Sequence, residues 1–289
     1  MSASPNAGPV TVFTHARPGE TDDAIRRLCA LAAERQLVVR LDPDETAKHP
    51  SLAQDAAVEV DAAVDLDSAV AVALGGDGTV LRAMRAFAGT AVPVYGVNFG
   101  EIGFLAAAGR EESASALAEA LDGKFETLSM PAISVQWGDG ERFAFNDIAL
   151  TRRAGDRVAE LAYAVSGEEV GRVRSDGIVV ATPAGSTGYN LANGGPVMAW
   201  GVEGYVVSFI APHSLTARAL VVAPDDRLTI RNLSADPVEL SLDGRPLAEV
   251  APGEGVDASF RLDMAVLALP AESSFYRRLR STFGRLASS

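Results

Sequence analysis

The first 123 residues alternate apolar runs with amphipathic stretches. The apolar runs are rich in Val, Ala and Leu at successive positions, which is typical of strands buried on both faces of a parallel sheet. The acidic segment 42–67 shows no regular period. The predicted strands are 10–14, 37–41, 69–74 and 92–97, and the predicted helices are 21–35, 79–88 and 111–121. Strands that alternate with helices indicate an N-terminal α/β domain with a parallel sheet.

From residue 124 onward the pattern changes to many short β-rich runs separated by turn residues. Gly138-Asp139-Gly140, between two such runs, predicts a hairpin turn. The predicted strands are 133–137, 143–151, 158–165, 170–173, 178–181, 205–210, 220–222, 227–231, 238–242 and 256–262. Short strands in this number indicate a second, all-β, sandwich-like domain.

A strand-like run at 264–269 and a basic, helix-like stretch at 274–286 close the chain. We expect this tail to pack back on the first domain. The predicted organisation is therefore an α/β domain over 1–123, a β-sandwich domain over 124–262 and a C-terminal strand and helix tail over 263–289.

The 289-residue chain carries 38 acidic against 25 basic side chains, a formal net charge of −13. A field of that sign repels polyanions, so neither nucleic acid nor an anionic membrane is expected as a partner. Only Lys48 and Lys124 are lysines. Two interpretations are open: a salt-adapted surface from an acidic proteome, or a GC-rich genome that replaces lysine with arginine.

The cysteine, Cys29, lies in an apolar helical stretch beside no group that would activate a thiol, so we interpret it as a buried apolar side chain. With one cysteine the chain forms no internal disulfide, and we expect a reducing, cytoplasmic setting. The N-terminus resembles no secretory leader, and no apolar run is long enough to span a membrane. The histidines have no metal-ligand spacing, so no protein metal site is expected.

The first candidate for chemistry is the turn Gly75-Gly76-Asp77-Gly78-Thr79, between a predicted strand and a predicted helix. Glycines there let backbone amides approach a phosphate, and the helix N-terminus favours an anion. The turn is neither a dinucleotide fingerprint, because Leu81 stands where glycine is needed, nor a P-loop, because Gly-Lys-Ser/Thr is absent.

Asp77 is the informative residue of this turn. A carboxylate beside phosphates is repelled unless it binds a metal, accepts from a hydroxyl or takes a proton. The alternative is that Asp77 caps a helix that starts at Thr79. Arg82 and Arg85 have the same two interpretations, as phosphate contacts or as solvated helix residues.

Two further segments carry polar groups at strand ends. The run from Asp176 to Pro196 passes from an apolar strand into a turn rich in glycine and hydroxyl groups, suited to a ribose or a base. A nucleophilic role for Ser186 fails, because Ala184 stands where the nucleophile elbow needs glycine. Asn146-Asp147 interrupts an apolar run, which favours either a pair that faces a ligand or a strand-end turn.

Together these segments resemble the NAD kinase family. The resemblance rests on the 75–79 turn, on the Asn146-Asp147 pair and on the Asp176–Pro196 run, with supporting likeness at 98–105 and 212–220. The turn alone is shared with lipid kinases and phosphofructokinases, whereas the three motifs in this order are specific. The chain departs from the family pattern at Gly188, Asn190 and 243–245.

The resemblance implies a site that binds NAD and a phosphate donor. Asp77 is implied as the catalytic base, with Gly78 as its backbone partner, and Arg157 falls at a binding position by counting from Asn146. The implied NAD-binding residues are Asp77, Gly78, Asn146, Asp147, Arg157, Arg174, Asp176, Ala181, Thr187, Gly188, Tyr189, Asn190, Leu191 and Ala192, and the implied donor loop is Gly75, Gly76, Gly78, Thr79 and Arg82.

The implied reaction moves a phosphoryl group from ATP or polyphosphate to the 2′-hydroxyl of the adenosine ribose of NAD. Mg²⁺ or another divalent cation would arrive with the donor, and the chain would form a homodimer or homotetramer. Two alternatives are a lipid or sugar kinase that shares the turn, which would lack the Asp176–Pro196 run, and a noncatalytic NAD(H)-binding regulator, which would lack Asp77.

Overall fold

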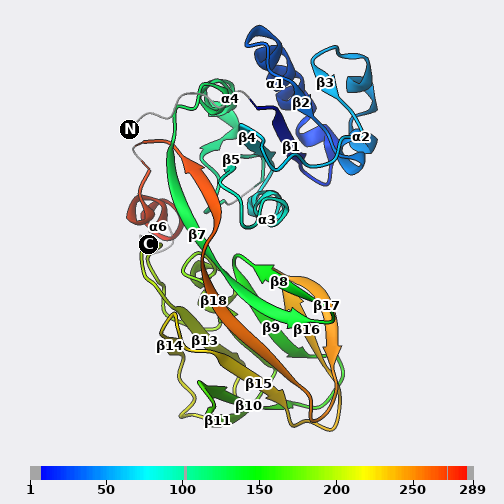
Figure 1. Cartoon of the computed structure of the whole chain (residues 1–289). Coiled ribbons are helices and arrows are strands. Elements are labelled where there is room, and N and C mark those ends of the chain that lie inside the picture. The colour runs from blue at the N-terminus through cyan, green and yellow to red at the C-terminus, as the bar shows by residue number, and fades with distance from the viewer. Residues whose placement is uncertain (1–7, 101–102, 272, 285–289) are drawn as a thin grey trace. The chain divides into compact units, whose positions relative to one another are not determined.

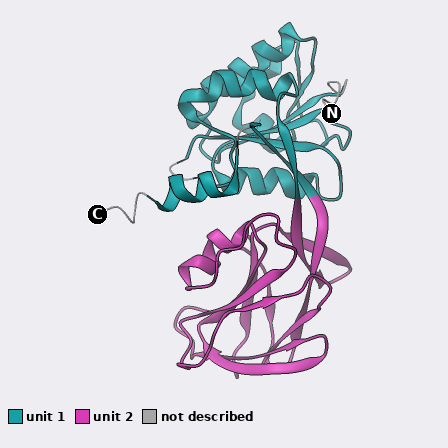
Figure 2. Cartoon of the chain, turned by 90° about the vertical axis from the view of Figure 1, so that its left-hand side faces the viewer, with its two compact units in different colours: residues 1–129, 265–289 teal, residues 130–264 magenta. Residues whose placement is uncertain are grey.

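A computed structural model describes residues 8–100, 103–271 and 273–284 (Figure 1). Contacts divide the chain into unit 1, with residues 1–129 and 265–289, and unit 2, with residues 130–264 (Figure 2). The chain therefore leaves unit 1 once and returns to it for its last segment.

The sheet of unit 1 is parallel, as the apolar runs predict. Its strand order is β18-β5-β4-β1-β2-β3. Every residue of the central strands β1 and β4 is buried, because helices cover both faces of a parallel sheet. The bounds are β1 Val10–Thr14, β2 Val39–Arg40, β3 Val58–Glu59, β4 Val70–Leu74, β5 Pro93–Asn98, β6 Ala108–Gly109 beside β5, and the end of β18, Gly255–Leu269.

The helices of unit 1 cover this sheet with apolar faces. Helix α1 buries Ile25, Leu28, Cys29 and Ala32 against the strands. Cys29 is free and buried, and burial raises its pKa to about 12, which confirms its interpretation as an apolar side chain. The helices are α1 Asp22–Glu34, α2 Pro43–Lys48, α3 Asp77–Ala86, α4 Ser113–Leu121 and α6 Phe275–Phe283, with 3-10 turns at Pro18–Glu20, Pro50–Gln54 and Arg110–Glu112.

Unit 2 consists of two sheets that face each other across one apolar core. One has the order β14-β13-β12-β9-β16-β17, and the other contains β7, β8, β10, β11, β15 and the first part of β18. Residues from both sheets, among them Leu161, Ile178, Tyr205 and Leu240, share the core. The bounds are β7 Glu126–Trp137, β8 Gly140–Ala144, β9 Asp147–Arg152, β10 Ala159–Val165, β11 Glu168–Ser175, β12 Gly177–Ala181, β13 Tyr205–Ile210, β14 Leu220–Val222, β15 Leu228–Asn232, β16 Val238–Leu242 and β17 Arg245–Val250.

The predicted fold class is confirmed, while several elements differ locally from their predictions. The predicted strand 143–151 is two strands, because the backbone N–H groups of Phe145 and Asn146 donate to the Asp243 carboxylate instead of to a strand. Strand β17 was missed because its exposure pattern has no clean alternation. The predicted strands 256–262 and 264–269 are one strand, β18, which passes a positive φ of 55° at Asp263.

The C-terminal segment belongs to unit 1, as expected of the tail. The end of β18 pairs in parallel with β5, and α6 follows it. Residues 285 and 286, the end of the predicted 274–286 helix, lie outside the described residues. No helix in the described part of the chain is long and apolar enough to span a membrane.

Candidate active site

The turn after β4 lies at the carboxyl end of the unit 1 sheet, where α3 begins. The helix starts at Asp77, two residues before the predicted start, and its N-cap is Gly76. A Cβ on Gly75 would lie 2.3 Å from the Thr79 hydroxyl oxygen, so the turn closes this tightly only with glycine. Gly76 and Gly78 have open space where a Cβ would stand, so ligand atoms can approach their backbone.

Asp77 does not cap its own helix. Its Oδ2 accepts from the Phe104 N–H at 2.8 Å and its Oδ1 from the Leu105 N–H at 3.0 Å. Burial raises the pKa of the Asp77 carboxyl, while these amide bonds and the charge of Arg278 oppose that rise. The carboxylate is therefore fixed by a loop remote in sequence.

The loop that holds Asp77 approaches it closely. A Cβ on Gly103 would lie 2.9 Å from Nδ2 of Asn98 and 3.3 Å from Oδ1 of Asp77. The loop belongs to the 98–105 segment that resembles the family, of which residues 101 and 102 lie outside the described residues. Sequence reasoning missed this contact, although the glycine was a visible signal.

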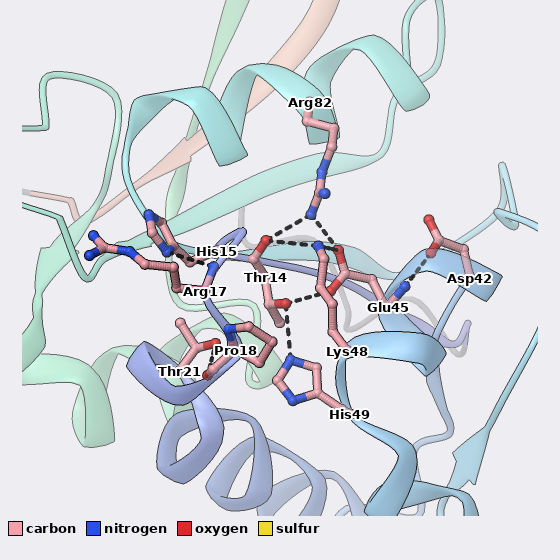
Figure 3. Close-up of polar contacts among 10 residues, drawn as sticks. All are labelled: Thr14, His15, Arg17, Pro18, Thr21, Asp42, Glu45, Lys48, His49 and Arg82. Carbon is pink, nitrogen blue, oxygen red and sulfur yellow. Dashed lines mark hydrogen bonds and ion pairs between the residues drawn. The ribbon is translucent and has the colours of Figure 1, made fainter.

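Arg82, expected in the donor loop, is engaged at the end of β1 (Figure 3). Its Nη2 donates to the Thr14 carbonyl at 2.9 Å and to Oε1 of Glu45. Glu45 is fully buried and also accepts from Lys48 Nζ at 2.9 Å and from the Thr14 hydroxyl. Sequence reasoning missed Glu45, which lies in the acidic segment without a clear period. Through Arg82 the pairing joins α3 to the end of β1 and to α2.

In unit 2, Asn146 and Asp147 form a strand-end turn built on Asp243. The Asp243 carboxylate accepts from the N–H groups of Phe145, Asn146 and Asp147 at 3.3, 2.7 and 3.3 Å. Thr182 adds a second attachment, since its N–H donates to the Asn146 carbonyl at 2.9 Å and its hydroxyl to the Phe145 carbonyl at 2.6 Å. The 243–245 segment, a loose family match, thus supplies the group that shapes the turn.

The Asp147 side chain is buried next to a second carboxylate. Asp147 is only 7% exposed. Burial and the charge of Asp243 raise the pKa of Asp147 to about 7. The group therefore changes charge near neutral pH, where a small change in surroundings decides its state.

Asp176 lies at the opposite end of the β9–β12 pair. Arg152 holds its carboxylate through Nε at 2.6 Å and Nη2 at 3.3 Å, and this lowers the pKa of Asp176. Sequence reasoning missed Arg152. Arg174 and Arg157 are exposed, on β11 and before β10 respectively.

The 185–192 segment separates into buried and exposed residues, as a 3-10 turn Gly185–Thr187 followed by α5, Tyr189–Ala192. Asn190 is fully buried and donates to the carbonyls of Ser186 and Pro196. Tyr189 is 41% exposed, and its pKa is raised by burial and by the charges of Asp147 and Asp176. Of the rest, Ala181 is buried opposite Asp147, Thr187 and Leu191 are half-buried, and Gly188 and Ala192 are exposed.

The close packing of Gly185 against the Asn146 carbonyl predicts a stability effect. A Cβ on Gly185 would lie 1.9 Å from the Asn146 carbonyl oxygen, whereas the nearest atom to a Cβ on Gly188 is 3.4 Å away. We expect Gly185→Ala to displace the Asn146 turn and to cost about 1–3 kcal/mol of unfolding free energy. Thermal unfolding of both variants checks this, with Gly188→Ala as the matched control. Equal melting temperatures for the two variants would contradict it.

Two protein-family models match the N-terminal and C-terminal parts of the chain separately. The ATP-NAD kinase N-terminal domain model matches residues 21–125, and the ATP-NAD kinase C-terminal domain model matches residues 145–259. An NAD kinase from Ralstonia nicotianae is 34% identical over 264 residues, which are 90% of this chain and 82% of that protein. An NAD kinase from Thermomicrobium roseum is 35% identical over 222 residues, covering 73% of this chain and 74% of that protein.

Two solved structures have a similar fold. Yeast NADH kinase complexed with NADH has a TM-score of 0.82 at 23% identity and covers 98% of this chain and 89% of its own. An NAD kinase from Archaeoglobus fulgidus in complex with ATP has a TM-score of 0.74 at 25% identity and covers 97% and 99%. Because relatives above 30% identity extend over most of both chains and both domain models match, this chain belongs to the NAD kinase family.

Proposed function

We propose that the chain phosphorylates the 2′-hydroxyl of the adenosine ribose of NAD, and that Asp77 is the general base. Membership in the NAD kinase family supports the reaction. The observation that carries the role of Asp77 is its fixed carboxylate at the carboxyl end of the parallel sheet, held by two backbone amides. A ribose hydroxyl is a weak nucleophile at neutral pH, so a positioned proton acceptor is what the reaction needs.

The proton and phosphoryl movements balance around this carboxylate. The ribose O–H bond breaks and its proton passes to Asp77, while the ribose oxygen bonds to the γ-phosphorus and the bond from that phosphorus to ADP breaks. The transition state is loose, so the protein contributes positioning and charge stabilisation. We place the donor phosphates at the open backbone of Gly76 and Gly78, at the N-terminus of α3.

We propose that ATP, or polyphosphate in its place, brings Mg²⁺ or another divalent cation as part of the substrate. Among the described residues, no group of three or more His, Cys, Asp or Glu side chains is arranged to hold a metal ion. We therefore assign no protein ligands to the cation and derive no step through it. When bound, the cation would neutralise charge on the transferring phosphoryl group.

We assign NAD recognition to a set of unit 2 residues. Asn146 and Asp147 would contact the adenosine half, because Asp243 and Thr182 hold their backbone in a fixed turn. Tyr189 offers an exposed aromatic face near Asp147 and Asp176. Asn190 would act through the turn that it supports, since its amide already donates to two backbone carbonyls.

Replacement of the base tests the central assignment. We expect Asp77→Asn to lower kcat by about 10²–10⁴, because the amide takes no proton. Since both Asp77 oxygens accept N–H groups, asparagine also sets its NH₂ against one donor, and the melting temperature should fall as well. Turnover is therefore measured on folded protein, with NAD affinity measured by calorimetry.

Asp44→Asn, at an exposed aspartate of α2, is the control for the loss of one carboxylate and should leave turnover unchanged. Asp77→Asn protein that retained more than about a tenth of the wild-type kcat would refute the base assignment.

The raised pKa of Asp147 predicts a pH-dependent affinity for NAD. If Asp147 accepts hydrogen bonds from the adenosine, only its ionised form binds, and that form is lost as the pH falls through about 7. The dissociation constant should then rise from about pH 8 to about pH 6, approaching tenfold per unit below the pKa.

Asp147→Asn should remove this pH dependence. Asn146→Ala should weaken binding by about 1–3 kcal/mol at every pH and leave the dependence intact. An affinity that increases as the pH falls would mean that Asp147 binds as a neutral donor.

We also propose that the chain self-associates as a homodimer or homotetramer in a cytoplasmic setting. Unit 2 exposes several large apolar side chains, with Leu215 94%, Val221 54% and Val202 41% exposed, and burial of such groups favours association. Light scattering should give a multimer mass at assay concentration. A fully active monomer would contradict this.

A further inference from the structure

The loop that holds Asp77 is itself held by the C-terminal helix. Phe104 packs against two rings of α6, edge to face with Phe275 at 5.6 Å between centroids and tilted against Phe283 at 6.5 Å. Helix α6 lies far from Phe104 in sequence, but both belong to unit 1. The helix is labelled in Figure 1. The first turn of the helix is capped, since the Ser274 hydroxyl oxygen accepts from the Arg277 N–H.

Arg278 makes the polar part of this contact. Its Nη1 donates to the Phe104 carbonyl at 3.1 Å and to the Ala106 carbonyl, and its Nε donates to the Ser273 hydroxyl at 2.9 Å. Three directed bonds fix the plane of the guanidinium and, through it, the two carbonyls of the loop.

One peptide group lies between Arg278 and Asp77. The carbonyl of Phe104 accepts from Arg278, and the N–H of the same peptide, which belongs to Leu105, donates to Oδ1 of Asp77. In a trans peptide these two groups point in opposite directions, so the guanidinium and the carboxylate face each other across it. A donor on the carbonyl polarises the peptide and strengthens the bond that its N–H gives.

We propose that Arg278 is a positioning residue for Asp77: it holds and polarises the Phe104–Leu105 peptide so that its N–H stays directed at the carboxylate, which makes α6 part of the phosphoryl-transfer site. The kinetic consequence rests on the proposed role of Asp77 as the base, whereas the effect on the carboxyl group itself does not.

The charged surroundings of Asp77 support this role. Burial raises the pKa of Asp77, and the loop amides and the charge of Arg278 oppose that rise. Burial likewise lowers the pKa of Arg278, and the charge of Asp77 opposes that fall. From β5 the ionisable group is Tyr95, whose pKa of about 12 leaves it neutral. Strands β1 and β4 carry no ionisable side chain. Helix α3 also carries Arg82 and Arg85, and α6 also carries Tyr276, Arg277 and Arg280. Glu112 and Glu119, before and on α4, act on Tyr95.

The test is the pH profile of kcat in Arg278→Met. Removal of the cation and its bonds should move the acid limb upward by roughly one pH unit, so that turnover on that limb falls roughly tenfold, with NAD affinity unchanged. Arg280→Met removes the same charge from an exposed position on α6 and should leave the profile unchanged. A purely structural role would lower the melting temperature without moving the limb, and that result would overturn the proposal.

Two further variants keep the test decisive if Arg278→Met does not fold. Arg278→Gln keeps a donor but no charge, and the limb should shift in the same direction; an unshifted limb would overturn the proposal. Arg278→Lys keeps the charge, so the acid limb of its kcat profile should lie closer to the wild-type position than that of Arg278→Met or Arg278→Gln.

A carbon-13 NMR titration of the Asp77 carboxyl separates this inference from the proposed function. The carboxyl midpoint should rise in Arg278→Met as the kinetic limb does. If the Asp77 midpoint rises in Arg278→Met while Asp77→Asn retains turnover, Arg278 positions Asp77 but Asp77 is not the base. If the midpoint does not move in Arg278→Met while Asp77→Asn is inactive, the base assignment stands and the role of Arg278 is refuted.

Discussion

A carboxylate withdrawn from water either receives hydrogen-bond donors or has its pKa raised, and much of the site in this chain depends on which of the two occurs. Asp77 takes two amides from the 104–105 loop, and Asp243 takes three from the 145–147 turn. Glu45 takes its donors from side chains of β1, α2 and α3. In each case the acid draws together segments that strand pairing alone would leave independent.

Glycine makes two of these assemblies sterically feasible. Without a side chain, Gly103 lets its loop approach Asp77, and Gly185 lets the hydroxyl-rich turn approach the carbonyl of Asn146. Because backbone atoms are the neighbours at Gly185, no rotamer change relieves a clash there. The motifs that resemble the family therefore combine acids that need donors with glycines that admit them.

The layer structure and the motif positions were predictable, because burial on both faces of β1 and β4 leaves a local, period-based signal. The partners of the polar residues were not. Asp243 lies 96 to 98 positions from the amides that it accepts, and Arg278 lies 172 and 174 positions from its carbonyls. No local period encodes such pairs, and an isolated Arg278 resembles any other basic residue of an exposed helix. Glu45 was missed for the same reason, since a buried acid inside an acidic segment looks like surface.

The two central aspartates show how one kind of side chain is set to different tasks by its surroundings. Burial raises the pKa of both. At Asp77 the amides of the 104–105 loop and the charge of Arg278 oppose the rise, which favours an ionised group that is ready to accept a proton. At Asp147 the charge of Asp243 adds to the rise, so the group titrates near 7 and its charge depends on what binds beside it. The backbone amides explain the difference: in unit 1 they donate to Asp77 itself, while in unit 2 they donate to its neighbour, Asp243, and leave Asp147 to face that charge.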